Sequence, residues 1–183
     1  EYQYQVKAIL DTQINLSSQS NIIQEHLEGI FQGKSVNILR STIKNNEFIA
    51  LDWEAYQGNI PQFIGYKIYR KSPTVNEFQL IDQVPYTHLN YVDEEVLVDS
   101  EKYTYKIGLA SQCFIDGSPD QSTSPILLKA IPYNDRSGQL EWSKYHLNNK
   151  EVDYYEIQKK DKYGRWIRVK TVPATSTTSE IDF

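Results

Sequence analysis

The fold of this chain is decided by the stretch Phe48-Ile49-Ala50-Leu51-Asp52-Trp53. Its large apolar residues alternate with small or polar ones, which is the period-two pattern of a half-buried β-strand. A buried tryptophan needs a layer packed across it. The nearest strand-like stretch able to supply that layer is Tyr66-Lys67-Ile68-Tyr69-Arg70. The sequence therefore indicates two β-layers around Trp53.

The same arrangement recurs further along the chain as an internal repeat. Trp142 follows Trp53 by 89 residues, and the same offset relates Tyr155 to Tyr66, Ile157 to Ile68 and Ile181 to Val92. An offset of 88 relates Trp166, Val169, Val172 and Pro173 to Phe78, Ile81, Val84 and Pro85. Several coincidences in nearly constant register predict two copies of one module.

A second recurrence links the N-terminal region to the middle of the chain. Tyr2-Gln3-Tyr4-Gln5-Val6 precedes Tyr103-Thr104-Tyr105-Lys106-Ile107 by 101 residues, and a Ser-rich strand start follows each of them. Residues 1–9 and 16–23 are therefore expected to form a two-stranded hairpin.

The segment 22–35 has no counterpart at the second junction and allows two interpretations. One is a short amphipathic helix, with Asn21 as its N-cap and Gly33 as its stop. The other is an extended strand that runs into a linker.

From residue 36 onward, short strands separated by turn residues are expected, with no helical interval between them. That pattern is typical of an antiparallel sandwich. The first seven are expected at 36–43, 47–55, 63–71, 77–84, 89–93, 102–111 and 121–129. Four more are expected near 138–145, 153–160, 165–172 and 178–182.

The landmarks Leu51-x-Trp53, Gly65-Tyr66-x-Ile68-Tyr69-Arg70, Tyr91-Val92-Asp93 and Tyr103-x-Tyr105-x-Ile107, in that order, resemble the fibronectin type III repeat. The resemblance implies an all-β fold, an immunoglobulin-like seven-stranded antiparallel β-sandwich. It places Trp53 on strand B and Tyr103 at the tyrosine corner of strand F.

The resemblance also implies a division of the chain into one complete repeat and two partial ones. Residues 36–128 would be the complete repeat. Residues 1–23 would be strands F and G of a preceding repeat, 24–35 a linker, and 129–183 strands A to E of a following repeat. Strand C and the pattern Phe-x-x-Ile-x-x-Val after it also resemble the repeats of large bacterial surface proteins tied to gliding motility and type IX secretion.

A sandwich without strands F and G leaves strand 153–160 with an unpaired edge, which is costly. The hairpin 1–23 supplies strands of the missing kind, so we expect the two fragments to pair into a second sandwich. Within one chain, residues 24–36 reach at most about 40 Å, roughly the length of the intervening module. Exchange between two chains is therefore favoured, as a closed dimer more than as an open array. Frayed ends are the alternative.

The length and composition of the chain limit which classes of function it can have. A chain of 183 residues holds one large domain or two of about 90. A net charge of −5, without a basic stripe, argues against nucleic acid, and no apolar run approaches the roughly 20 residues that cross a bilayer. The chain starts at Glu1 without a signal peptide, as expected of a piece of a longer protein. Cys113 is expected to be a free buried thiol, or to pair with a cysteine outside the chain.

No arrangement of side chains predicts catalysis, a metal site or a cofactor. His26, His88 and His146 lie in unrelated segments and are expected to be surface histidines. Asp93-Glu94-Glu95 and Asp99-x-Glu101 are acidic clusters, expected to be solvated loop faces rather than a cation site.

Two groups of residues are candidates for a ligand or partner face. Tyr56, Phe63 and Tyr86 are expected in the B–C loop, at the start of strand C and in the C′–E loop; they are either exposed aromatics or the rim of the core. The second group lies in the F–G loop, where the fibronectin type III family often carries adhesive contacts: Asp116, Ser118 and Asp120. A plain turn is the alternative for that loop.

The sequence thus favours a non-catalytic structural or adhesive repeat of a larger secreted or cell-surface protein, one that spaces or presents other domains. The alternatives are an accessory linker module of a secreted polysaccharide-degrading enzyme, or a carbohydrate- or protein-binding module. Expected partners are neighbouring repeats, a protein or glycan ligand, and a second chain in a strand-exchanged homodimer, with neither nucleic acid nor membrane insertion.

Overall fold

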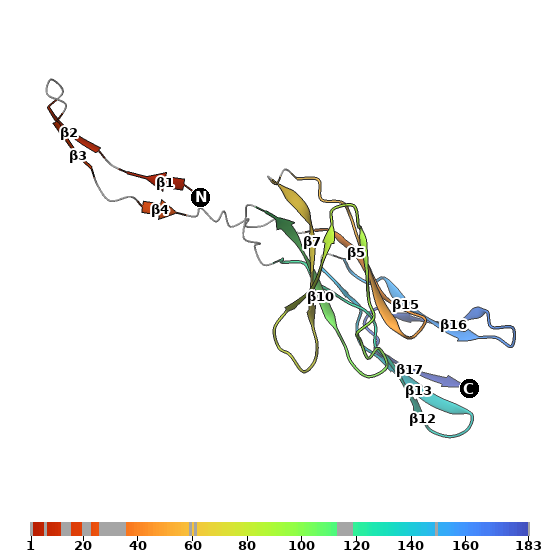
Figure 1. Cartoon of the computed structure of the whole chain (residues 1–183). Coiled ribbons are helices and arrows are strands. Elements are labelled where there is room, and N and C mark those ends of the chain that lie inside the picture. Colours follow the sequence, from red (N-terminus) through yellow and green to blue (C-terminus); the bar gives the residue numbers. More distant parts are fainter. Residues whose placement is uncertain are drawn as a thin grey trace.

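A computed structural model describes residues 2–5, 7–11, 16–19, 23–25, 36–58, 60, 62–112, 119–148 and 150–182. Every regular element in these ranges is a β-strand (Figure 1). The strands fall into three groups along the chain: an N-terminal hairpin, a complete repeat and a half-repeat.

The complete repeat consists of two antiparallel sheets that enclose one core. The first sheet has the order β5-β6-β9, and the second β8-β7-β10-β11, with β14 (His146–Leu147) of the half-repeat added at its end. The expected immunoglobulin-like antiparallel β-sandwich is therefore confirmed. The strands of the two sheets are β5 (Ile38–Lys44), β6 (Phe48–Trp53), β9 (Asn90–Asp93), β8 (Gln79–Pro85), β7 (Phe63–Lys71), β10 (Thr104–Ser111) and β11 (Thr123–Ser124).

The core of this sandwich forms where the alternating apolar residues of the two sheets meet. Trp53 is 2% exposed and Tyr103 is 5% exposed, so both rings are buried as predicted. The ring of Trp53 meets that of Tyr66 edge-on, at 5.4 Å between centroids. Aromatic pairs in this geometry add to the free energy gained by burial.

Local turn chemistry closes the sandwich. Asn45 and Asn46 both have positive φ, 54° and 59°, which matches the right-handed twist of a β5–β6 hairpin. At the other end, the hydroxyl of Tyr103 accepts the backbone N–H of Leu97 at 3.1 Å and donates to Glu101 at 2.7 Å. Tyr103 thus makes the tyrosine-corner contact expected of it, pinning the crossing from β9 to β10.

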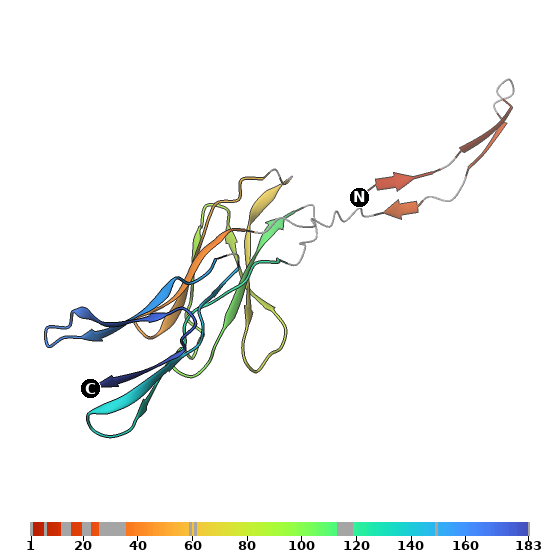
Figure 2. The same ribbon diagram turned by 180° about the vertical axis from the view of Figure 1, so that it is seen from behind.

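The half-repeat copies five strands of the complete repeat. One sheet has the order β12-β13-β17, and β15 pairs with β16 in the other. Both views show the hairpins β12–β13 and β15–β16 extending away from the complete repeat, at the end where the C-terminus lies (Figures 1 and 2). The strands are β12 (Leu128–Pro132), β13 (Ser137–Trp142), β15 (Tyr154–Lys160), β16 (Trp166–Pro173) and β17 (Thr178–Asp182).

The two repeats agree in atomic detail around the tryptophan. Trp142 meets Tyr155 at 5.6 Å and 68°, against 5.4 Å and 67° for Trp53 and Tyr66. The hydroxyl of Tyr66 accepts the N–H of Tyr56 at 3.0 Å. In the half-repeat, the hydroxyl of Tyr155 accepts the N–H of Tyr145 at 3.2 Å.

The strand registers of the two repeats also agree, but the offset predicted for strand E has to be corrected. The β7–β8 ladder shifts after Ile68 and the β15–β16 ladder after Ile157, at equivalent positions. In strand E the structural offset is 88 and not 89: Ala50 pairs with Val92, whereas Gln139 pairs with Glu180. The predicted match of Val92 with Ile181 is wrong by one residue. Ile181 stands opposite Gly138, where Asp93 stands opposite Ile49 in the complete repeat.

The single strand expected over 121–129 is two strands. β11 covers only Thr123–Ser124, and β12 begins at Leu128, which pairs with Trp142 of the half-repeat. Because β11 and β12 lie in sheets of different repeats, the chain has to cross between them, and residues 125–127 make that crossing.

The N-terminal region contains the expected hairpin in two paired segments. β1 (Tyr2–Tyr4) pairs with β4 (Ile23–Glu25), and β2 (Lys7–Asp11) pairs with β3 (Leu16–Gln19). Residues 23–25 are therefore extended, and the helical interpretation is wrong for these three. The remainder of the predicted linker, 26–35, lies outside the described residues.

Candidate functional site

The junction between the two repeats joins a strand of one repeat to a strand of the other. We define it as residues 120–124 of the complete repeat and 145–148 of the half-repeat. β14 (His146–Leu147) pairs antiparallel with β11, Thr123 opposite Leu147 and Ser124 opposite His146. A strand of the second repeat therefore covers the edge of the first repeat's sheet, and an uncovered edge would otherwise be open to other chains.

A buried chain of hydrogen bonds lies beneath this strand pair. The hydroxyl of Thr123 donates to the carbonyl of His146 at 2.9 Å and lies 2.7 Å from the hydroxyl of Ser41. Because the proton of Thr123 is committed to His146, Ser41 acts as the donor to Thr123. Ser41 and Thr123 are both buried, and the hydroxyl proton of Thr123 has its acceptor in the carbonyl of His146 while β14 is in place.

Apolar packing fixes the same contact. Leu147 is 7% exposed and belongs to the core of the complete repeat, although it comes from the half-repeat. Tyr145 packs against the cores of both repeats, and its hydroxyl accepts the N–H of Ser41 at 3.2 Å. The two cores are thus joined through one aromatic ring and one leucine.

Polar contacts complete the rim of the junction. Asn148 donates its backbone N–H to the carbonyl of Ser122 at 3.1 Å and its side-chain amide to the carbonyl of Asp120 at 2.9 Å. The ring of His146 lies 3.0 Å from the hydroxyl of Ser122. Two residues singled out from the sequence, Asp120 and His146, therefore take part in the junction. His146 lies in a strand, and its side chain is exposed.

The predicted aromatic face is gathered at one end of the complete repeat. Phe63 lies 5.7 Å from Tyr56 and 6.5 Å from Tyr86, measured between ring centroids. The N–H of Tyr86 donates to the carbonyl of Ile64 at 3.2 Å, which holds the C′–E loop beside the start of β7. Tyr56 and Phe63 pack on the core, whereas Tyr86 is 60% exposed. The face therefore combines two rim residues with one ring in solvent.

The first acidic cluster is a solvated face only at Glu94 and Glu95, which are exposed, because Asp93 is buried. Both of its carboxylate oxygens lie 2.9 Å from Nη1 of Arg70, and the hydroxyl of Tyr105 donates to it at 2.8 Å. The N–H of Glu95 also donates to it, at 3.1 Å. Burial is compensated by these bonds, as a charged group in a core requires.

Titration of this network follows from the same contacts. Burial raises the pKa of the Tyr105 hydroxyl far above its ordinary value, and the charge of Asp93 raises it further. Burial lowers the pKa of the Arg70 guanidinium, but the hydrogen bond and charge of Asp93 outweigh that effect and raise it. Arg70 is therefore charged and Tyr105 neutral at neutral pH.

Several predicted residues play no part in these contacts or lie outside the described residues. His88 is exposed and near the hydroxyl of Thr87. The described residues contain no group of three His, Cys, Asp or Glu side chains able to hold a metal ion. In the same ranges, no helix is long and apolar enough to cross a membrane. Outside the described residues lie His26, Cys113, Asp116 and Ser118.

Sequence reasoning missed three residues that carry the junction, Thr123, Tyr145 and Leu147, and also Ser41, which contacts two of them. A signal was present, because Tyr145-His146-Leu147 alternates apolar and polar residues, and Tyr145 follows Tyr56 by 89 residues. The alternation is only three residues long, too short to be distinguished from the end of strand B.

No family model and no curated protein matches this chain. Similar solved structures include chicken CNTN1 FN1–FN3 domains, at 16% identity and a TM-score of 0.42, covering 90% of this chain and 60% of that one. This chain thus spans about 60% of the length of that structure. A two-domain fibronectin type III segment of chicken tenascin is 14% identical, with a TM-score of 0.35 and 81% of each chain covered. The central fibronectin-III array of RIM-binding protein is 14% identical, with a TM-score of 0.37, covering 81% of this chain and 51% of that one.

Proposed function

We propose that this chain is a non-catalytic structural repeat of a longer secreted or surface protein, in which it holds neighbouring domains at a fixed spacing and angle. The observation that supports this is the junction. A three-residue connection, a shared strand pair and a leucine of one repeat in the core of the next leave little freedom for bending.

The energetics support a stiff connection. Burying a leucine side chain stabilises a contact by about 2 kcal/mol, and each hydrogen bond of the junction adds about 1 kcal/mol. Leu147 and the Thr123–His146 bond together favour the docked arrangement by several times the thermal energy. Repeats that contact mainly their neighbours transmit such local geometry along an array.

The stiffness is testable with spin labels on exposed residues of the two repeats, Lys102→Cys and Asp135→Cys in a Cys113→Ser background. Pulsed electron spin resonance should give one narrow distance distribution. Leu147→Asp should broaden it by placing a charge in the core contact, and Leu147→Ala should broaden it less. Val169→Ala, at an exposed site of the half-repeat, is the control and should leave it unchanged. A broad distribution in the parent chain, or no response to Leu147→Asp, contradicts the proposal.

The extracellular location is part of the proposal and is supported by the resemblance to fibronectin type III repeats. Antibodies raised against this chain should label intact cells of its source, or their culture medium. Labelling only after the cells are permeabilised would contradict it.

A second candidate function is binding of a flat ligand, such as a sugar ring, at the aromatic face. It is favoured by the exposed ring of Tyr86 beside Phe63, and by the Tyr56 hydroxyl, which is buried without a hydrogen-bond partner among the described residues. Aromatic rings present large apolar surfaces with a polar handle. A glycan array with the parent chain and Tyr86→Ala tests this, with Tyr133→Ala as a matched exposed-tyrosine control. Absence of binding to every sugar excludes the candidate.

A further inference from the structure

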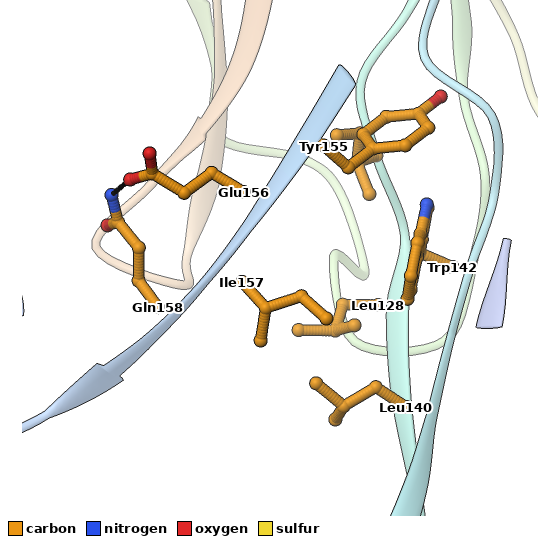
Figure 3. A pocket seen from close by; sticks show the side chains of 8 residues that line it. Leu128, Leu140, Trp142, Tyr155, Glu156, Ile157 and Gln158 are labelled. Carbon is orange, nitrogen blue, oxygen red and sulfur yellow. Dashed lines mark hydrogen bonds between the residues drawn. The ribbon is translucent and has the colours of Figure 1, made fainter. Parts of the chain in front are cut away.

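The half-repeat has an open apolar cleft between its two sheets. The cleft has a volume of about 200 Å³. Figure 3 shows Tyr155 and Ile157 pointing toward Trp142, Leu128 and Leu140, whereas Glu156 and Gln158 point away. In the part of the chain that the structure describes, β15 pairs with β16 along one edge and with no strand along the other.

The complete repeat shows what occupies the equivalent space. There β10 pairs along the free edge of β7, with Ile107 opposite Ile68 and Lys106 opposite Tyr69. Tyr105 and Ile107 are fully buried between the sheets. The added strand changes the burial of strand A. Ile38, which pairs with Trp53, is 1% exposed, whereas Leu128, which pairs with Trp142 in the half-repeat, is 55% exposed.

We propose that the N-terminal hairpin of a second copy of this chain, which consists of β1, β2, β3 and β4, docks along the open edge of β15. It would take the place that β10 and β11 take in the complete repeat. The proposal is independent of the spacing function above. It commits to a second copy, because the chain itself carries a segment that matches the missing strands.

The sequence of the hairpin matches strand F in pattern and register. The recurrence of 101 residues aligns Tyr4 with Tyr105 and Val6 with Ile107. Combined with the offset of 89, this alignment predicts that Val6 pairs opposite Ile157 and Gln5 opposite Gln158. One buried face of a strand requires apolar residues at every second position. The segment has them at Tyr2, Tyr4, Val6, Ala8 and Leu10.

The backbone of the hairpin is already in the required form. β1 pairs with β4 and β2 with β3, both antiparallel, so strands F and G arrive as a closed pair. An isolated two-stranded hairpin is marginal in water, and so is an unpaired edge above an open core. Docking would stabilise the hairpin and would also pair the open edge and cover the core beneath it.

The composition of the cleft favours an apolar strand face. Ile181 stands where Asp93 lies in the complete repeat, so the buried carboxylate that binds Arg70 and Tyr105 has no equivalent in the half-repeat. A face such as Tyr4-x-Val6-x-Ala8 therefore meets an apolar surface, and the association should depend little on salt.

Chain length favours a second copy over the same chain. Ten residues, 26–35, separate the hairpin from the start of the complete repeat and reach about 36 Å at full extension. The eight residues of β10 alone span about 26 Å of that repeat, and the junction and β15 lie beyond it. Two chains have no such limit, and each offers one hairpin and one open edge, so reciprocal docking closes a dimer.

The test uses the full chain in a Cys113→Ser background, with two single-cysteine variants. Gln5→Cys marks the hairpin and Gln158→Cys marks the outward side of β15, at positions predicted to face one another. Equal amounts of the two variants are mixed, oxidised mildly and examined for cross-linked dimer. The matched control replaces Gln158→Cys by Thr171→Cys, on the neighbouring strand β16 and away from the open edge.

The expected result is a disulfide-linked dimer of Gln5→Cys with Gln158→Cys, at least several-fold above the Thr171→Cys control. Sedimentation of the parent chain should show association that Ile157→Lys abolishes. No cross-link above the control overturns the proposal. So does a monomeric parent chain, and so does a double variant, Gln5→Cys with Gln158→Cys, that closes only within one chain.

Discussion

The complete repeat and the half-repeat share five strands, the Trp–Tyr pair and the ladder shift, yet they differ in what is buried. Ile68 is fully buried, whereas its equivalent Ile157 is only partly buried. Strand geometry is therefore set within each sheet and survives without strands F and G. The burial of side chains is not set within one sheet, because it requires the second sheet to extend across the first.

The largest expected difference concerns the two tryptophans. Trp53→Ala should destabilise the complete repeat by about 3–5 kcal/mol, because it empties a closed core. Trp142→Ala should cost less than half of that, since its ring already lies beside an open cleft. Hydrogen exchange of peptides from β7 and β15, compared with the parent chain, separates the two effects. Equal losses of protection would show that the half-repeat is as closed as the complete one.

The next expected effect concerns the buried charge that only the complete repeat has. Asp93→Ala leaves Arg70 without its partner and Tyr105 without its acceptor. Loss of one partner of a buried pair costs about 3–5 kcal/mol, and the partial exposure of Arg70 reduces this to about 2 kcal/mol. Urea unfolding measures it. The control is Asp52→Ala, at the exposed pair with Arg40, which should leave the midpoint nearly unchanged.

Alkaline pH should weaken the complete repeat through Tyr105. Burial, and then the charge of Asp93, raise the pKa of its hydroxyl in the folded state, whereas a tyrosine of the unfolded chain titrates near pH 10. Above pH 10 only the unfolded chain releases this proton, so stability is retained below that pH and falls above it. The expected slope is about 1.4 kcal/mol per pH unit. Urea midpoints from pH 8 to 11 measure it, and Tyr105→Phe should reduce the slope.

The smallest expected effect tests a feature that the two repeats share. Tyr66→Phe and Tyr155→Phe each remove the hydroxyl that accepts one backbone N–H, from Tyr56 and Tyr145 respectively. Each change should cost about 1 kcal/mol. Exchange of the Tyr56 and Tyr145 amides, followed by nuclear magnetic resonance, should accelerate only in the repeat that is changed. Acceleration in both would mean that the repeats unfold together.

Most of the strand pattern was predictable because it depends on neighbouring residues. The alternation in Phe48–Trp53 and in Tyr66–Arg70 places β6 and β7 within two or three residues of their ends. The pair Asn45-Asn46 predicts the turn that precedes β6. Offsets of 88 and 89 then carry these assignments into the half-repeat.

What was not predictable depends on residues distant in sequence. β14 forms where β11 offers it an edge, and the alternation around its two residues is too short to predict a separate strand. Asp93 stands in an acidic run typical of a solvated loop, and its burial is favourable because Arg70 and Tyr105, on the facing sheet, bind its carboxylate. The aromatic face was predicted residue by residue, but its assembly around Phe63 required the packing of β7 against the C′–E loop.

By itself, the sequence determined the strands, their turns and the presence of two related modules, because period-two alternation and turn residues act over a few positions. Only the tertiary structure decided where the modules meet, which acid is buried and which edge is left open. Those outcomes depend on surfaces brought together by the chain as a whole, and the free energy of burial belongs to such surfaces rather than to any one segment.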